Sequence, residues 1–348
     1  MKKLALPFMA VLFAVLAFAP SLLDGYNLSL LGRFLALALV TLGLVWCWGK
    51  GGVLSLGQGV FFGLGGYALA MHLKLVGLPA GEIPDFMMWN GMTTLPAWWE
   101  PFKNPFFAVA MVFVVPGIAS FIMANLLFRR RITGVYVSLI TQAVALAFAT
   151  LLTSQQGVTG GFNGLTNFST LFGFNYGTPE MQKVLYWITL GFVVLTFVVG
   201  VVLERTYFGK TLLAIRDGEN RSRYLGYDPV PYKVFAFTLA GILAGVAGAL
   251  FTLHVGVISP AMVGVVPSIE MVVWAAIGGR ESLMGAIIGT VFINFAKDRI
   301  STALPDAWLY IMGVLFMLVV LFPPQSWKLP KIFRAAAKKP ALKEVHGD

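Results

Sequence analysis

The residues of this chain that could do chemistry are polar side chains placed inside long apolar runs. Gln58 and Gln142 each carry an amide, which offers two donors and one acceptor group, and Thr141 adds a hydroxyl. A buried polar group without a partner costs roughly 1–3 kcal/mol, so each must face protein, water or a solute. Their chemistry suits a small neutral solute that forms hydrogen bonds, and we predict that they line its route. The predicted route residues are Gln58, Phe62, Thr141, Gln142, Glu270 and Asn294.

Two stretches of the sequence are rich in glycine. Gln58 lies within Leu54–Tyr67, where glycine is dense enough for close helix approach or local unwinding. Tight packing and a route-lining segment both fit this stretch. Gly241, Gly245 and Gly248 form a small-residue face, which predicts helix packing.

Glu270 is the carboxylate placed well inside an apolar segment. An ionisable group in such a position is a functional hypothesis by default. Because Glu270 lies toward one end of its segment, a solvated structural role is the alternative. One carboxylate gives little support to a proton-coupled carrier, which commonly needs a relay.

Enzyme chemistry and nucleotide binding are disfavoured. Gly209–Thr211 ends like a phosphate-binding loop, but Glu204 occupies the place of its first glycine and no strand precedes it. The histidines lack metal-ligand spacing, and the single Cys47 cannot form an internal disulfide. No nucleophilic triad is recognisable. We therefore predict a chain that is not an enzyme and binds no cofactor itself.

The composition indicates lipid as the solvent for most of the chain. Of 348 residues, 58% are hydrophobic and only 11% are charged, against about 25% charged in average soluble proteins. Ten membrane helices of about 20 residues each would leave room for loops and tails only. The net charge of +10 would suggest nucleic acid for a soluble protein, but basic residues of membrane proteins gather in cytoplasmic loops. We expect a lipid bilayer and no nucleic acid as partner.

Ten apolar segments predict an all-α, polytopic membrane protein. They are Leu4–Leu23, Leu30–Trp48, Val53–Leu73, Phe106–Phe128, Ile132–Leu152, Val184–Leu203, Val234–Val255, Met262–Ile277, Leu283–Phe295 and Trp308–Phe322. The eighth and ninth are short, so they either span with a tilt or form a re-entrant hairpin. With the N-terminus inside, most basic residues fall in inner regions, which predicts that both termini are cytoplasmic.

The ends and loops refine this plan. The first segment imitates a signal peptide ending at Ala17–Ala19, but Pro20 and the run's length favour a retained helix. We expect a membrane domain at 1–325 and a basic cytoplasmic tail at 326–348. The inner loop 204–233 mixes charges with apolar positions, which is typical of a short docking helix ended by Gly218. A solvated basic loop is the alternative.

Three stretches resemble the permeases of branched-chain amino acid ABC importers. They are the inner-loop sequence Tyr207–Asp217, the glycine-rich Leu54–Tyr67, and Ile277–Arg280 followed by Gly285. The resemblance covers about Leu30 to Phe322. One departure is Glu281, where a glycine would be expected after Gly278-Gly279-Arg280.

Within this family, three further stretches are most similar to the permeases of urea importers. They are Thr159–Phe168, Pro267–Trp274 and Pro305–Trp308. The resemblance implies inward transport of urea or short amides across the cytoplasmic (inner) membrane. Branched-chain amino acid import by the same machine is the runner-up. An ATP-independent carrier or channel is an alternative of another class.

The resemblance also implies partners. These would be a second permease subunit forming a heterodimer, two cytoplasmic ATPase subunits holding ATP-Mg, and a periplasmic solute-binding protein. The inner loop would transmit the ATPase movement. The residues implied to couple this chain to the ATPases are Thr211, Leu212, Ile215, Arg216, Asp217, Gly218 and Glu219.

Overall fold

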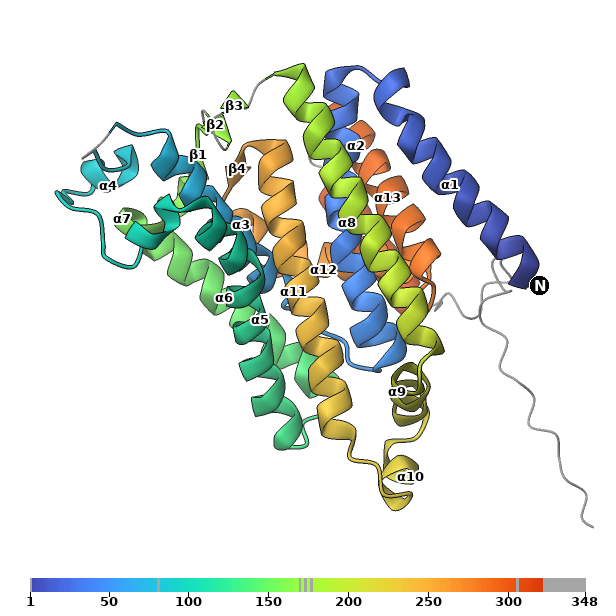
Figure 1. Ribbon diagram of the computed structural model, residues 1–348. Coiled ribbons are helices and arrows are strands. Elements are labelled where there is room, and N and C mark those ends of the chain that lie inside the picture. Colours follow the sequence, from blue (N-terminus) through green and yellow to red (C-terminus); the bar gives the residue numbers. More distant parts are fainter. Residues whose placement is uncertain are drawn as a thin grey trace, which may run out of the picture.

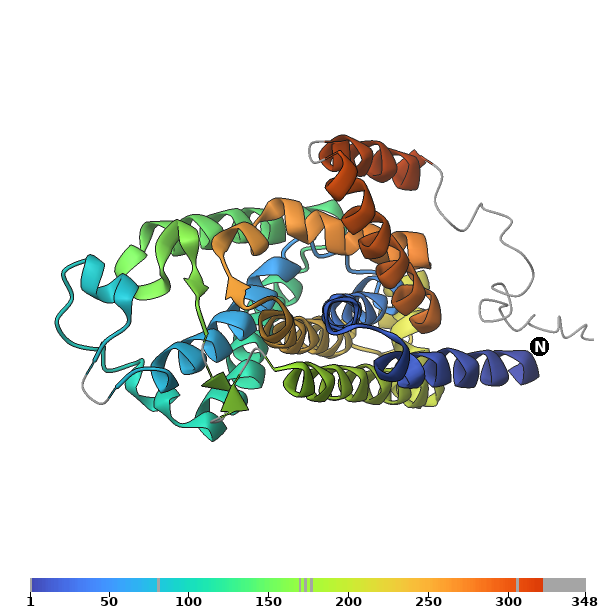
Figure 2. The same cartoon turned by 90° about the horizontal axis from the view of Figure 1, so that it is seen from above.

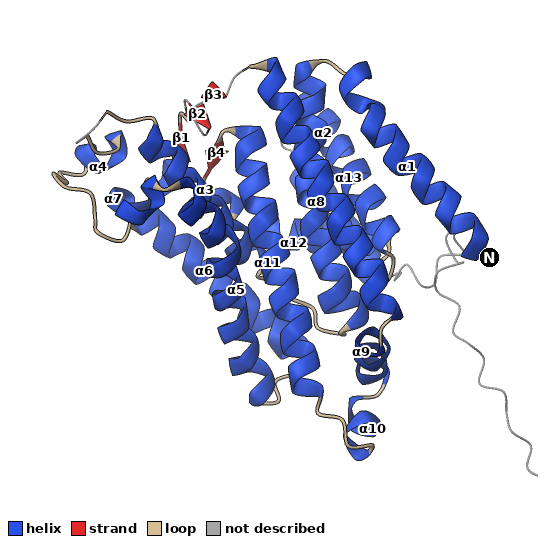
Figure 3. Ribbon diagram, viewed as in Figure 1, coloured by secondary structure: helices blue, strands red, loops and turns tan. Residues whose placement is uncertain are grey.

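The computed structural model describes residues 2–79, 82–168, 170–171, 174–175, 178–304 and 307–321. A helix lies at each of the ten apolar segments (Figures 1 and 3). These helices are α1 Lys2–Leu22, α2 Gly25–Leu44, α3 Gln58–Val76, α5 Pro105–Arg129, α6 Val135–Ser154, α8 Pro179–Arg205, α11 Pro229–Val255, α12 Val265–Gly278, α13 Leu283–Ala303 and α14 Ala307–Leu321. The predicted tail 326–348 lies outside the described residues, as do Pro305, Asp306 and Phe322.

Shorter elements connect them. The shorter α-helices are α4 Asp85–Trp89, α7 Gln156–Thr159, α9 Tyr207–Asp217 and α10 Glu219–Tyr224. A π-helical turn, η1, covers Val45–Lys50, and 3-10 turns cover η2 Glu100–Lys103, η3 Gly161–Asn163 and η4 Pro260–Met262. Figure 1 shows α9 and α10 at one end of the bundle and α4 and α7 toward the opposite end.

Local sequence sets where the long helices begin. α5, α8 and α11 each start with a proline, whose fixed φ suits the first helical position. The residue before each proline caps the helix through its side chain: Asn104 accepts from the Phe106 amide, Thr178 from Met181 and Asp228 from Val230.

The bundle is organised around α11, which packs against α2, α3 and α5. α2 and α3 are mostly buried, whereas fewer than half of the residues in the spans of α5, α6 and α8 are buried. Viewed from above, α6 runs along the edge of the molecule (Figure 2). Exposed apolar side chains on these outer helices suit contact with lipid or another membrane subunit.

Seven helices of the described residues are long and apolar enough to cross a membrane. These candidate spans are 25–50, 58–76, 105–129, 135–154, 179–205, 229–255 and 260–278. The structure is therefore that of a helical multi-pass membrane protein. Ten spans, cytoplasmic termini and the domain boundary at 325 stay predictions.

The structure corrects three details of the sequence analysis. The chain is not wholly helical, because β1 Leu165–Thr166 pairs antiparallel with β4 Val257–Ile258, and β2 Thr170–Leu171 with β3 Phe174–Asn175. The third apolar segment becomes helical only at Gln58, since glycines at 51, 52 and 57 favour a turn. The ninth is longer than its apolar core and runs on through charged residues to Ala303.

Candidate functional site

The central feature is a break in helical structure between α2 and α3. Residues 51–57 leave the helix and fold back on η1, where the Gly51, Gly52 and Val53 amides donate to carbonyls of Trp46, Trp48 and Cys47. Gly52 has a φ of +70°, which an L side chain rarely adopts. The turn is therefore fixed by its own backbone.

Neighbouring helices pair further backbone groups of the broken segment and of the first turn of α3. The Ser138 hydroxyl of α6 donates to the Leu54 carbonyl at 2.9 Å, and Thr141 accepts from the Leu56 amide at 3.0 Å. From α12, the Ser268 hydroxyl accepts from the Gly59 amide at 3.1 Å. Irregular backbone within a membrane bundle is stable only when its polar groups are paired in this way.

Gln58 is the first residue of α3 and is fully buried. None of the described residues forms a hydrogen bond with either its amide nitrogen or its amide oxygen. The predicted neighbour Thr141 lies close by, because a Cβ at Gly57 would stand 2.5 Å from the Thr141 carbonyl oxygen. The structure thus joins two predicted route residues around an unpaired amide.

The other predicted route residues have different surroundings. Phe62 is buried on α3, with its ring edge-on to Phe251 at a centroid distance of 5.4 Å. Gln142 is half-buried on α6. The Asn294 amide on α13 donates to the Thr290 carbonyl at 2.9 Å. Of this group, only Gln142 shares a helix with the residues that hold the break.

Glu270 on α12 has a full set of strong partners. The Lys297 ammonium of α13 donates to both carboxylate oxygens, at 2.9 and 2.7 Å, and the Trp308 indole of α14 donates at 3.1 Å. The carboxylate therefore joins three helices through a neutralised pair. A place on the route for Glu270 stays a prediction, and this geometry shows the structural use of the side chain.

At the other end, the short helix expected within 204–233 is present as α9, and its docking role stays a prediction. Thr206 caps it by accepting from the Gly209 amide, and it ends at Gly218, as its sequence indicates. Thr211, Leu212 and Ile215 are buried, so these three predicted coupling residues attach α9 to the bundle. Exposed apolar side chains nearby include Tyr207 and Leu213 on α9 and Tyr224 and Leu225 at the end of α10.

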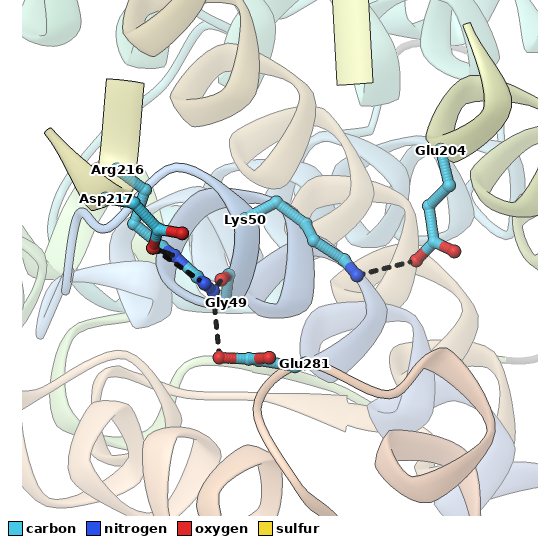
Figure 4. Close-up of polar contacts among 6 residues, drawn as sticks. All are labelled: Gly49, Lys50, Glu204, Arg216, Asp217 and Glu281. Carbon is cyan, nitrogen blue, oxygen red and sulfur yellow. Dashed lines mark hydrogen bonds and ion pairs between the residues drawn. The ribbon is translucent and has the colours of Figure 1, made fainter. Parts of the chain in front are cut away.

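Arg216 connects α9 to two other elements (Figure 4). Its guanidinium donates to the Gly49 carbonyl at the end of η1 and to the Glu281 carboxylate, 2.9 Å away, in the turn between α12 and α13. It also pairs with the adjacent Asp217 at 3.0 Å. A second ion pair, Lys50 with Glu204 at 3.0 Å, stands beside this cluster.

Glu219 ties α10 to the start of α11. It pairs with Arg223 at 2.9 Å and with Lys233 at 2.5 Å. Burial alone would raise the pKa of Glu219, but the hydrogen bonds and charges of Lys233 and Arg223 outweigh burial and hold the pKa below the ordinary glutamate value.

This pKa shift predicts an acid-sensitive contact. The carboxyl binds protons more tightly once the contact is broken, so its stabilisation is present above the ordinary glutamate pKa of about 4.3 and is lost as the pH falls through the lowered value. We expect hydrogen-exchange protection of residues 219–233, corrected for intrinsic rates, to drop in that acid range. The Glu219→Gln variant should lack this step; the same step in both proteins would contradict the assignment.

Sequence reasoning missed several residues of these clusters. Lys297 lies beyond Phe295, the predicted end of the ninth segment, although α13 continues to Ala303. Ser268 gave no signal, since a lone serine in an apolar helix is ordinary. Glu281 did give one, because a carboxylate stands where the resembled motif has glycine. Among the described residues, no group of three or more His, Cys, Asp or Glu side chains could hold a metal ion.

The broken, mostly apolar bundle with short helices at one end defines a multi-pass membrane protein of the transporter type. The chain belongs to the family of permease components of branched-chain amino acid transport systems, whose family model matches residues 26–321. No solved structure matches it.

Curated relatives agree with the family. The high-affinity branched-chain amino acid transport system permease protein LivM of Salmonella typhimurium is 26% identical over 300 residues, covering 80% of this chain and 64% of the relative. The Escherichia coli protein of that name is 25% identical with the same coverage. The autoinducer 2 import system permease protein LsrC of Klebsiella pneumoniae is 33% identical over 145 residues, 37% of this chain and 41% of the relative. The chain thus spans less than two thirds of the length of these relatives.

Proposed function

We propose that this chain is a permease subunit of an ABC importer that carries urea or short amides inward across the cytoplasmic membrane. Ten spans with both termini inside would place α9 and α10 in the cytoplasm and the α4–α7 end outside. Membership of the permease family supports the proposal that the chain is part of an ABC importer. The substrate rests on the motif resemblance to urea permeases and on the chemistry at the break.

The unpaired amide of Gln58 carries the substrate proposal. Broken helices often form the substrate site of transporters. A fully buried amide without a partner in the described chain offers donors and an acceptor to a solute that has both. The charged pair nearest in sequence to Ser268, Glu270 with Lys297, is already neutralised. These features favour a neutral solute over one that brings its own charges.

A branched-chain amino acid is the second candidate, and the relatives' names favour it. LivM of Salmonella typhimurium and of Escherichia coli are named for branched-chain amino acid transport and align with 80% of this chain. An amino acid carries a carboxylate and an ammonium, which would need charged or dipolar partners on the route. The start of α3 could face the carboxylate, as helix N-termini do in other transporters.

The proposed partners are those of an ABC importer. A second permease chain would complete the route, and a periplasmic protein would deliver solute. Two ATPases holding ATP-Mg would bind below, against the exposed Leu213, Tyr224 and Leu225. Buried Thr211, Leu212 and Ile215 would pass their movement into the bundle.

Uptake of labelled urea at low micromolar concentration tests the proposal, in cells with and without this gene. Concentrative, energy-dependent urea uptake that is lost without the gene and does not respond to leucine would support it. Unchanged urea uptake with lost leucine uptake would replace the substrate. Gene-dependent uptake that needs no ATPase would replace the machine with an ATP-independent carrier.

Replacing Gln58 with leucine should separate stability from transport. The variant removes an unpaired buried amide at similar volume, so the solute-free protein should become more stable by about 1–3 kcal/mol. Uptake should fall roughly tenfold or more if the amide binds solute, since 1.4 kcal/mol corresponds to a factor of ten. Thermal unfolding in detergent and uptake at matched membrane levels measure the two effects.

Asn294→Leu is the matched control for stability. Its amide already donates to the Thr290 carbonyl, so its loss should not stabilise the protein. Unchanged uptake in both Gln58→Leu and Gln142→Leu at normal membrane levels would show that these amides do not face the route.

A further inference from the structure

The side chain of Arg216 lies between α9 and the broken segment that leads to Gln58. Arg216 stands at the last turn of α9 and is mostly buried, with 17% of its side chain exposed. One guanidinium nitrogen donates both to the Gly49 carbonyl and to Glu281. A single side chain therefore joins α9, the end of η1 and the α12–α13 turn, as Figure 4 shows.

The two elements that Arg216 joins also touch each other. A Cβ at Gly49 would stand 1.8 Å from the Arg280 carbonyl oxygen, so η1 and the turn meet backbone to backbone. The Arg280 guanidinium lies over the Trp48 ring, 5.5 Å from its centroid. Because backbone contacts cannot yield by rotamer changes, the turn and η1 are expected to move together.

The contact continues directly into the broken segment. A Cβ at Gly52 would lie 2.8 Å from Cγ of Arg216, so the aliphatic part of this side chain rests on the start of the break. The chain then runs from Gly52 to Gln58 without a helix, held by Ser138 and Thr141 of α6. A shift of Arg216 would act on a segment whose far end is the unpaired amide.

We propose that Glu281 is a positioning residue for energy coupling: by holding Arg216 against the Gly49 carbonyl, it links α9 to the break that carries Gln58. The inference rests on the proposed importer function. Glu281 touches neither solute nor nucleotide in this scheme. It sets where Arg216 lies, so that movement of α9 changes the geometry of residues 51–57 and with it the solute site.

The test is the number of solute molecules moved per ATP by the assembled importer in proteoliposomes, with its binding protein. Glu281→Gln keeps the size of the side chain and removes its charge. We expect this ratio to fall at least about fivefold, within the usual range of coupling free energies, while ATP hydrolysis without solute and subunit assembly stay normal. A purely structural role would lower assembly and hydrolysis together.

Glu204→Gln is the matched control. Glu204 pairs with Lys50 at 3.0 Å and is 34% exposed, against 2.9 Å and 33% for Glu281, and it stands beside the same cluster without touching Arg216. In Glu204→Gln, the number of solute molecules moved per ATP should stay near the wild-type value. An unchanged ratio in Glu281→Gln, or equal losses in both variants, would overturn the inference.

A double variant gives a second reading. If Glu281 acts through Arg216, the loss in Glu281→Gln/Arg216→Gln should match that of Arg216→Gln alone, because residues in one contact are not additive. A loss in the double variant equal to the product of the two single-variant losses would overturn the inference. Failure of the proposed function is distinguishable, since it would appear in the wild type as no transport of urea or amides, or no associated ATPase.

Discussion

In the proposed importer, replacing Arg216 with glutamate should disrupt coupled uptake while leaving the complex assembled. A glutamate at this position would remove the donors to Gly49 and Glu281 and would place a new carboxylate beside Glu281 and Asp217. Like charges at this distance repel, so the end of α9 should move away from η1 and the turn. We expect uptake to fall roughly 100-fold, toward the upper end of coupling effects between sites.

The measurement compares solute uptake with ATP hydrolysis in the same purified complex. Lys210→Glu is the control, since it makes the same charge reversal on the same helix at an exposed position. The control should keep most of its uptake, because surface charges contribute little to local stability. Normal coupled uptake in Arg216→Glu would rule out the assigned role, and loss of the ATPases in both variants would indicate a docking effect instead.

The parts of this fold that follow from simple patterns could be predicted. Apolar length alone placed a helix at each of the ten segments, because a membrane helix needs a long apolar run whatever its neighbours are. Gly218 indicated the end of α9, because glycine commonly follows the last residue of a helix. These signals are local, so one sequence suffices to read them.

The parts that depend on distant contacts could not be predicted. The break at residues 51–57 lies inside an apolar run that continues into α3, so the pattern alone does not reveal it. Hydrogen bonds with Ser138, Thr141 and Ser268 on other helices stabilise it. Likewise, the ion pair of Glu270 depends on Lys297, which is 27 residues away along the chain. Sequence pattern identifies such polar residues as unusual, but the fold decides which of them find partners.

The same distinction applies within the candidate site. Gln58 and Asn294 are both amides in apolar segments, and the sequence gives no reason to treat them differently. In the fold, Asn294 bonds to its own helix through the Thr290 carbonyl, whereas Gln58 opens α3 and has no such carbonyl one turn before it. Position at a helix start therefore leaves the Gln58 amide without a hydrogen-bond partner among the described residues.

Replacing Gly65 with alanine should prevent the central helices from packing. Gly65 of α3 faces Gly245 of α11, and an added Cβ would stand 2.0 Å from the Gly245 carbonyl oxygen. On the same pair of helices, a Cβ at Gly248 would lie 1.9 Å from the Phe62 carbonyl oxygen. Membrane helices use such small residues to bring their backbones together, and here the contact is backbone on backbone, so no side chain can turn aside.

We expect Gly65→Ala to lose about 3 kcal/mol of folding free energy, at the upper end of the usual cost of overpacking. That loss corresponds to roughly a 100-fold shift toward unfolded protein, since each 1.4 kcal/mol is a factor of ten. Protein abundance in the membrane and thermal unfolding in detergent measure it.

Gly191→Ala on the exposed face of α8 is the control, because nothing lies within 4 Å of its added Cβ. Alanine is also the better helix former, so this variant should be neutral or slightly more stable. Equal behaviour of the two variants would mean that α3 and α11 do not meet closely. The placement of α3, and with it of Gln58 at the start of this helix, would then lose one of its supports, because α11 is a main packing partner of α3.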